Sequence, residues 1–398
     1  MGQPFIKRLL LIGLLVVGVF TFGKRQLVVE KYVENRPKIG ITFDGPPKVL
    51  EMLKTDLQVV DHFNYTINMP GQVPYRFDFK YSRDNDGKYL LQVTYLNNNQ
   101  IEEIRKYKTG DRSYYPFLVH KAVYDINKYF NLPDVSFLKR KVLYSIVTAP
   151  RRASIYIADY SLTFRRRIIS GGLNTFPKWA NDEQTQFFFT KMDFLPTLYK
   201  YDITNGHKVK IVTSQGMLVA SDRRGSKLLL TMAPKGAPDI YLYDMETGKL
   251  QRVTTNSASD VSGHFWGENK IAFVSDRYGV PLVFSKDLVT GQTRRVLYWG
   301  KNQVGVDTYK GYLVISSRES SRAYGKNSFN LFLVNQQDYG LERLTTHGQN
   351  SSPNFSVDGS SIMFIKRSGL GSQIGIIRLQ EKKVFYYPLS KRLQSFDW

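Results

Sequence analysis

The side chains that could carry out chemistry are few in this chain of 398 residues. It contains no cysteine, which excludes thiolate nucleophiles and disulfides. Its sequence lacks the nucleophile elbow Gly-x-Ser-x-Gly, the zinc motif His-Glu-x-x-His and a phosphate-binding glycine loop. Five histidines are present, none with metal-ligand spacing: His62, His120, His207, His264 and His347. We therefore predict no catalytic residue, metal or cofactor.

Asp260 and Asp307 are the acidic residues that could line a channel and hold a metal there. A channel-site hydrolase therefore stays open as an alternative, although single acidic residues at turns are usually structural. His264 is expected to be a packed ring.

The elements that would position these side chains are indicated by a position that recurs through the C-terminal two-thirds of the chain. It is occupied by Asp159, Asp202, Asp244, Asp287, Asn335 and Arg378, at intervals of 43, 42, 43, 48 and 43 residues. Each occurrence follows a short strand-like run. A repeat of about 40–45 residues made of short strands is typical of a four-stranded propeller blade. Six copies predict a six-bladed β-propeller, and hence a protein whose function is binding.

Local patterns inside the repeat support this architecture. The first apolar run of each repeat, such as Leu228–Met232, is continuous, as expected for a strand covered on both faces. Asp-x-x-x-Gly turns follow at Asp202–Gly206 and Asp244–Gly248, where glycine tolerates the left-handed conformation. The segment before Val142 lacks the Pro-x-Trp piece that should begin the first blade. The residues Ser395–Trp398 resemble it, so we expect the last strand to complete blade one and close the ring.

The beginning of the chain has the pattern of an export signal. Lys7 and Arg8 precede an apolar run from Leu9 to Phe22, which is 14 residues long and short for a membrane-spanning helix. Cleavage after Gly23 fits the small residues there, and an uncleaved anchor is the alternative. We predict a signal peptide at 1–23, an α/β domain at 24–135 and the propeller at 136–398.

Helical and strand periodicities alternate in the predicted α/β domain. Apolar residues have helical spacing over Lys48–Val60 and Tyr114–Tyr129. Tyr75–Tyr81 and Tyr89–Tyr95 read as strands joined by the hairpin turn Asp84–Gly87. Further strands are expected at Arg36–Phe43 and Ile101–Lys108. Two helices against a mixed sheet would make a compact module.

The basic excess of the chain lies in the predicted propeller. The net charge is +22. Residues 24–135 have 17 basic and 14 acidic side chains, whereas residues 136–398 have 37 and 20. The basic residues include Arg151, Arg152, Arg165, Arg166 and Arg167. Such a surface attracts anionic partners; in an exported protein these would be acidic proteins or phosphate-bearing envelope surfaces, not nucleic acid. A solvated basic surface without a ligand is the simpler interpretation.

The whole arrangement resembles the TolB family of the bacterial Tol-Pal envelope system. Arg36–Ile41 is similar to the family's strand near the mature N-terminus, and Ile271–Gly279 and Ser352–Gly359 are similar to its repeat consensus. The export signal, the α/β module, the six repeats and their order also agree. Ala220–Gly225 departs from the family's Trp-Ser-Pro-Asp-Gly loop, which leaves individual loop contacts open.

The resemblance implies a periplasmic scaffold and not an enzyme. In the family, one open end of the channel receives the lipoprotein Pal, and the mature N-terminus engages TolA. Binding of the two partners is linked, and the system maintains outer-membrane integrity and draws this membrane in at division. Other outer-membrane proteins are further possible partners. The alternative is a different exported or membrane-anchored propeller that binds anionic envelope components.

Two sets of partner-binding residues follow. Polar residues before the innermost strands should converge on the channel mouth and contact a Pal-like partner: Gln215, Asp260, Gln303, Gln349, Asn350 and Ser351. The alternative is that they are solvated turn residues. Leu27, Val28 and Val29 could pair with a TolA-like partner by edge addition, or could form an ordinary first strand.

Overall fold

The computed structural model describes residues 36–398, apart from 69–72, 321, 326 and 370. The predicted export signal and the segment Leu27–Val29 lie outside the described residues. Residues 37–398 form one compact unit. Its described helices are all too short or too polar to cross a bilayer.

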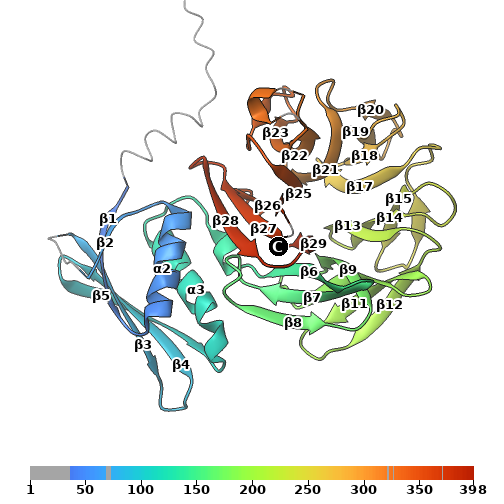
Figure 1. Cartoon of the computed structure of the whole chain (residues 1–398). Helices are drawn as coiled ribbons and strands as arrows, with labels where there is room; N and C mark the ends of the chain where they lie inside the picture. Colours follow the sequence, from blue (N-terminus) through green and yellow to red (C-terminus); the bar gives the residue numbers. More distant parts are fainter. Residues whose placement is uncertain (1–35, 69–72, 321, 326, 370) are drawn as a thin grey trace, which may run out of the picture. The chain divides into compact units, whose positions relative to one another are not determined.

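The first part of this unit is a five-stranded sheet with two helices (Figure 1). The strand order is β2-β1-β3-β4-β5, with β1 parallel to β2 and β3 and the remaining pairs antiparallel. The strands are β1 (Lys38–Asp44), β2 (Asn64–Ile67), β3 (Tyr75–Arg83), β4 (Tyr89–Asn97) and β5 (Gln100–Thr109). The helices are α2 (Pro47–Val60) and α3 (Tyr115–Tyr129), preceded by the short η1 (Arg112–Tyr114). The predicted α/β architecture is confirmed.

Helix α2 forms where helical spacing and end signals agree. Val49, Leu53, Leu57 and Val60 are fully buried on one face, so packing of that face stabilises the helix. Proline occupies the first turn, and Asp61 ends the helix in the left-handed conformation with φ of 55°.

The propeller contains six blades of four strands. Each eight-stranded sheet holds two blades, joined by a single parallel bridge, and each four-stranded sheet holds one. From the innermost strand outward, the first three blades are β29 (Leu393–Asp397), β6 (Val142–Ala149), β7 (Arg152–Ala158), β8 (Arg165–Ile169); β9 (Leu173–Trp179), β10 (Gln186–Met192), β11 (Pro196–Asp202), β12 (Lys208–Thr213); and β13 (Leu218–Arg224), β14 (Lys227–Met232), β15 (Asp239–Asp244), β16 (Leu250–Arg252). The last three are β17 (Asp260–Trp266), β18 (Lys270–Ser275), β19 (Leu282–Asp287), β20 (Thr293–Arg295); β21 (Lys301–Tyr309), β22 (Tyr312–Arg318), β23 (Phe329–Asn335), β24 (Leu341–Arg343); and β25 (Gln349–Phe355), β26 (Ser361–Ser368), β27 (Gly371–Arg378), β28 (Lys383–Leu389). A short η3 (Arg322–Tyr324) lies between β22 and β23.

The ring is closed by the last strand, as the sequence predicts. Strand β29 is the innermost strand of blade one and pairs antiparallel with β6, with Asp397 opposite Leu143 (Figure 1). Trp398 is buried, and its indole N–H donates to the carbonyls of Asn354 and Phe355 in blade six. Blade one therefore contacts blade six through residues from the end of the chain.

The antiparallel pairing gives the ring two distinct faces. We call the end where the innermost strands begin the entry face, and the end where they finish the exit face. The connections from the fourth strand of one blade to the next blade lie on the entry face, together with the turns between second and third strands. The turns between third and fourth strands, where the recurring Asp position stands, lie on the exit face.

One position near the end of each innermost strand alternates in chemistry around the axis. From blade one to blade six it is occupied by Asp397, Lys178, Asp222, His264, Asp307 and Asn354. Each of the three carboxylates accepts a backbone N–H from the following blade, at 2.8 Å from Trp179, 2.8 Å from Phe265 and 2.6 Å from Phe355. These bonds join blades one to two, three to four and five to six.

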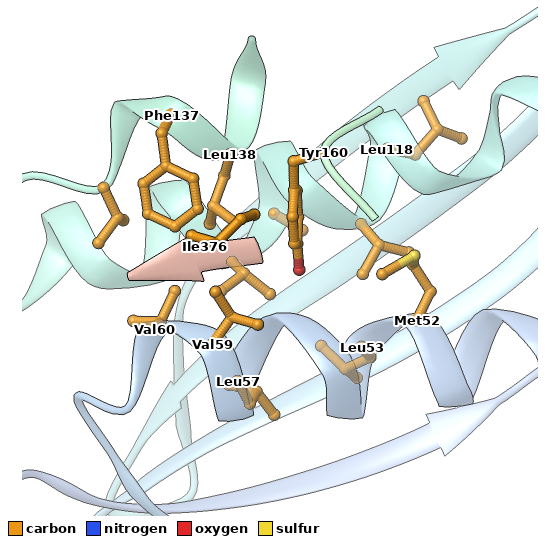
Figure 2. Packing of buried hydrophobic residues seen from close by; sticks show 14 of the residues in the cluster. Met52, Leu53, Leu57, Val59, Val60, Leu118, Phe137, Leu138, Tyr160 and Ile376 are labelled. Atoms are coloured by element: carbon orange, nitrogen blue, oxygen red, sulfur yellow. The ribbon is translucent and has the colours of Figure 1, made fainter. Parts of the chain in front are cut away.

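The α/β module packs on the exit face at blades one and six. A single hydrophobic cluster includes α2, the short helix η2 (Ser136–Lys139) and strands of both blades. Figure 2 shows Met52, Leu53 and Leu57 of α2 facing Tyr160 of blade one and Ile376 of blade six. The Phe137 backbone N–H also donates to Asp358 of blade six at 3.2 Å.

Candidate functional site

The six residues predicted at the channel mouth all lie on the entry face. Gln215 precedes β13, Asp260 begins β17, Gln303 is in β21, and Gln349, Asn350 and Ser351 begin β25. Their exposure differs. Gln215 and Gln349 are exposed, Ser351 is partly buried, and the other three are fully buried.

The buried members bind the protein itself. The Asp260 carboxylate accepts two bonds from Arg277, at 3.1 and 3.2 Å. The Gln303 side chain accepts from the Val283 N–H at 2.8 Å. The Asn350 amide donates to the Phe329 carbonyl at 2.9 Å. These three side chains shape the mouth, and Gln215 and Gln349 are the exposed members of the predicted set.

A group of acceptor atoms at the mouth has no hydrogen-bond partner among the described residues. It consists of the side-chain oxygens Asn174 Oδ1, Ser214 Oγ, Asn350 Oδ1, Ser351 Oγ and Gln394 Oε1. All five residues lie at or just before the start of an innermost strand, in blades one, two, three and six. Asn174, Ser214 and Gln394 were not predicted, although they stand at the repeat positions used to select the predicted six. Buried acceptors without partners are costly, so this part of the mouth is suited to an incoming hydrogen-bond donor.

Exposed aromatic side chains lie on the same face as this mouth and were also missed. Phe194 is 97% exposed, Tyr298 84% and Tyr278 67%, and Trp299 and Met217 are partly exposed beside them. All five are in entry-face connections. Their types gave a signal, since each is a large apolar residue in a connection between strands. Aromatic residues of this kind dominate protein–protein binding energies.

Each face also has a shallow polar pocket. The entry-face pocket, of about 230 Å³, is lined by Thr254, Thr255, Asn256, Arg277, Lys286 and Thr293. The exit-face pocket, of about 340 Å³, includes Arg224, Phe265 and Lys310. Arg224 lies over the Phe265 ring and donates to the Gly267 carbonyl at 2.6 Å.

On the exit face, a buried charge network links the α/β module to blade one. His120 of α3 lies between two carboxylates, with Nδ1 2.8 Å from Asp56 Oδ2 and Nε2 3.4 Å from Asp159 Oδ2. Tyr160 donates to Asp56 at 2.6 Å. Burial alone would lower the pKa of His120, but the charges and hydrogen bonds of both carboxylates outweigh it and raise this pKa to about 9. The imidazolium is therefore the charged group that joins the two carboxylates.

A second buried network links the module to blade six. His62 Nδ1 lies 2.6 Å from Asn127 Oδ1, and its Nε2 lies 2.8 Å from Glu381 Oε1. Arg378 donates to the same Glu381 oxygen at 3.0 Å. Burial would raise the pKa of Glu381, but the hydrogen bond from His62 and the charge of Arg378 lower it overall. The sixth recurring position, where Arg378 replaces Asp, therefore serves the domain contact.

The two aspartates considered for a channel metal are both occupied by other groups. Asp260 is paired with Arg277, and Asp307 Oδ1 lies 2.8 Å from His264 Nδ1. The His264 ring is packed, as predicted, with 7% exposure. Among the described residues, no group of three or more His, Asp or Glu side chains could hold a metal ion.

Comparison with known proteins agrees with this architecture. The family model of the TolB beta propeller domain matches residues 220–385. The Tol-Pal system protein TolB of Wolinella succinogenes is 37% identical, over 94% of this chain and 92% of the relative. The Tol-Pal system protein TolB of Campylobacter jejuni (strain RM1221) is 40% identical, over 87% of each chain.

A solved structure shows the same fold. The crystal structure of TolB from Acinetobacter baumannii aligns with a TM-score of 0.77 at 19% sequence identity, covering 92% of this chain and 96% of that chain. These two curated relatives match most of the sequence at 37% and 40% identity. This chain therefore belongs to the TolB family of Tol-Pal system proteins.

Proposed function

We propose that this protein is a periplasmic scaffold, without catalytic activity, that links the inner-membrane Tol complex to Pal. In this role the entry face binds a Pal-like lipoprotein, and the N-terminal segment with Leu27, Val28 and Val29 binds a TolA-like protein. The two events together support outer-membrane integrity and constriction at division. Family membership supports a role in the Tol-Pal system.

The observation that carries the Pal assignment is the composition of the entry face. Buried acceptors without partners lie at the channel mouth, and exposed aromatic residues lie on the same face. A partner loop can donate hydrogen bonds to the former while the latter pack on its apolar surface. Protein interfaces combine these two features, with aromatic residues as the main anchors.

A binding experiment with paired variants tests this assignment. Tyr298→Ala removes an entry-face aromatic side chain that is 84% exposed, and Tyr339→Ala removes a 52% exposed one from an exit-face turn. We expect Tyr298→Ala to weaken affinity for purified Pal by about 2 kcal/mol, which is roughly 30-fold. Tyr339→Ala should leave it unchanged. If both variants and the unaltered chain bind Pal with equal affinity, the entry face is not part of the Pal interface.

Linkage between the two partners is tested separately. If coupling has the usual size of about 1–3 kcal/mol, Pal changes TolA affinity roughly 5–150-fold. Titration calorimetry of TolA into the protein, with and without saturating Pal, measures this factor. Identical TolA affinities with and without Pal would refute the linkage and show that the protein binds its two partners independently.

A further inference from the structure

Blade one has five exposed arginines that the scaffold role does not use. Arg151 and Arg152 lie at the β6–β7 turn, and Arg165, Arg166 and Arg167 begin β8, opposite the far end of β7. All five side chains are exposed. We call these five residues the arginine hairpin. From Lys139 to Gly172 the chain has eight basic residues and one acidic residue, Asp159, which is buried in the exit-face network.

The arginine hairpin has more charge than its neighbours pair with. Within the described part of the chain, none of its five arginines forms an ion pair with a carboxylate. Other strand cations of the propeller do, such as Lys227 with Asp244. The Arg166 guanidinium lies over the Tyr114 ring, 5.6 Å from its centroid. That contact orients the guanidinium, whose charge is also one of the causes that lower the pKa of the exposed Asp111.

The geometry presents the arginines outward along one blade. Strand β8 pairs only with β7 among the described strands, so it is the outermost strand of its blade. The register places Arg167 opposite Tyr156 and Arg165 opposite Ala158. Because side chains alternate along a strand, Arg165 and Arg167 share one side, with Cα atoms about 7 Å apart. Arg166 points to the other side.

The chemistry of the patch favours a phosphate-bearing surface over a protein. Protein interfaces depend on buried aromatic anchors, and the most exposed aromatic side chains of the propeller, Phe194, Tyr298 and Tyr278, lie in entry-face connections of blades two, four and five. The exposed apolar side chain beside the arginine hairpin is that of Val147 in β6, which is 37% exposed and is aliphatic, not aromatic. Arginine matches phosphate oxygens with two parallel hydrogen bonds, and basic clusters bind anionic membranes through charge alone.

We propose that the arginine hairpin binds the phosphate groups of an anionic phospholipid surface. This interaction is independent of the proposed scaffold function. It would hold the outer edge of blade one against a membrane.

Vesicle sedimentation tests the proposal. The purified full chain is mixed with vesicles containing phosphatidylglycerol or with vesicles of phosphatidylcholine alone, at low and at moderate salt. We expect binding only to the anionic vesicles, weakened by salt. The triple variant Arg165→Gln, Arg166→Gln, Arg167→Gln should bind roughly a hundredfold more weakly, since each basic residue near an anionic membrane contributes about a fivefold factor.

A matched variant separates position from net charge. Lys249→Gln, Lys270→Gln, Arg294→Gln removes three exposed charges from blades three and four. It should keep most of the binding, and so should replacement of Arg165, Arg166 and Arg167 by lysine. Equal losses in both glutamine triples would assign the attraction to overall charge and overturn the proposal.

Two further outcomes are decisive. Failure of the unaltered chain to bind anionic vesicles refutes the lipid interaction. If the arginine triple then loses affinity for an acidic protein instead, the hairpin is a protein-binding site. Tyr298→Ala should still bind vesicles, so a failed Pal assignment and a failed lipid assignment give different results. Circular dichroism of both triples should match the unaltered chain, because all the replaced side chains are exposed.

Discussion

Closure of the ring by Trp398 can be tested by a single substitution, Trp398→Ala. The side chain is 6% exposed, and its ring centroid lies 6.0 Å from that of Phe137. Its indole N–H lies 3.2 Å from the Asn354 carbonyl oxygen and 3.0 Å from that of Phe355. Truncation of a buried tryptophan costs about 3–5 kcal/mol, and the lost hydrogen bond about 1 kcal/mol more. The sum is a large part of the roughly 5–15 kcal/mol that stabilises a domain.

Thermal unfolding followed by circular dichroism measures this loss. In domains of 150–250 residues, 1 kcal/mol shifts the Tm by roughly 2–4 °C, and larger domains shift less. We therefore expect a Tm about 8 °C lower. Deletion of residues 395–398 should be more severe. It also removes Asp397, whose carboxylate lies 2.8 Å from the ammonium of the mostly buried Lys178, and a buried charge left without its partner costs about 3–5 kcal/mol.

The control is Phe194→Ala, which removes an aromatic ring that is 97% exposed on the entry face. Its stability should change by less than about 0.5 kcal/mol. A Tm for Trp398→Ala within about 2 °C of the unaltered chain would show that the ring does not depend on this closure.

Three further predictions concern single side chains. The pKa of His120 is raised to about 9, above its unfolded value, so its stabilisation is complete below about pH 6.5 and is lost as the pH rises through 9. His120→Asn should therefore cost up to about 3 kcal/mol more at pH 6 than at pH 10 in denaturant unfolding, and a difference independent of pH would contradict the charged pair. Gly359→Ala should lower the Tm by several degrees because the new Cβ would lie 2.1 Å from the Tyr309 ring. The control Gly225→Ala, also at positive φ but in open space, should lower the Tm less. Equal shifts of the Tm would exclude the steric cause. Hydrogen bonds, led by that from the Thr204 hydroxyl, lower the pKa of Asp202 to about 2, so Thr204→Val should raise this pKa in an NMR titration, and an unchanged pKa would show that the hydroxyl does not matter.

The propeller could be predicted because its signals are local and repeated. The turn at Asp202–Gly206 needs only five consecutive residues, and Gly206 indeed has a positive φ of 73°. Ring closure could be predicted because the piece missing before Val142 appears again at Ser395–Trp398. Strand β2 gave a weak signal because, at the edge of its sheet, its side chains are exposed or only partly buried.

The site was harder to predict because side-chain burial depends on distant parts of the chain. Asp260 and Asn350 were expected to face a partner, yet both are fully buried. The Asp260 carboxylate pairs with Arg277, and the Asn350 amide donates to the Phe329 carbonyl. The His120 network joins residues 64 and 39 positions apart, which no local pattern reveals. Asn174 could have been predicted, because it has the same position in its repeat as Asn350, the second residue of an innermost strand.

The alternation of inner-strand carboxylates has a consequence for how such a ring can change in size. Asp397, Asp222 and Asp307 each hold the blade that follows, so the structural period of the ring is two blades. Gain or loss of a whole pair preserves the alternation of donor and acceptor blades. Gain of a single blade would put two like blades side by side, whereas in this ring every joint with a carboxylate is followed by one without. An even number of blades is thus built into the hydrogen bonding around the axis.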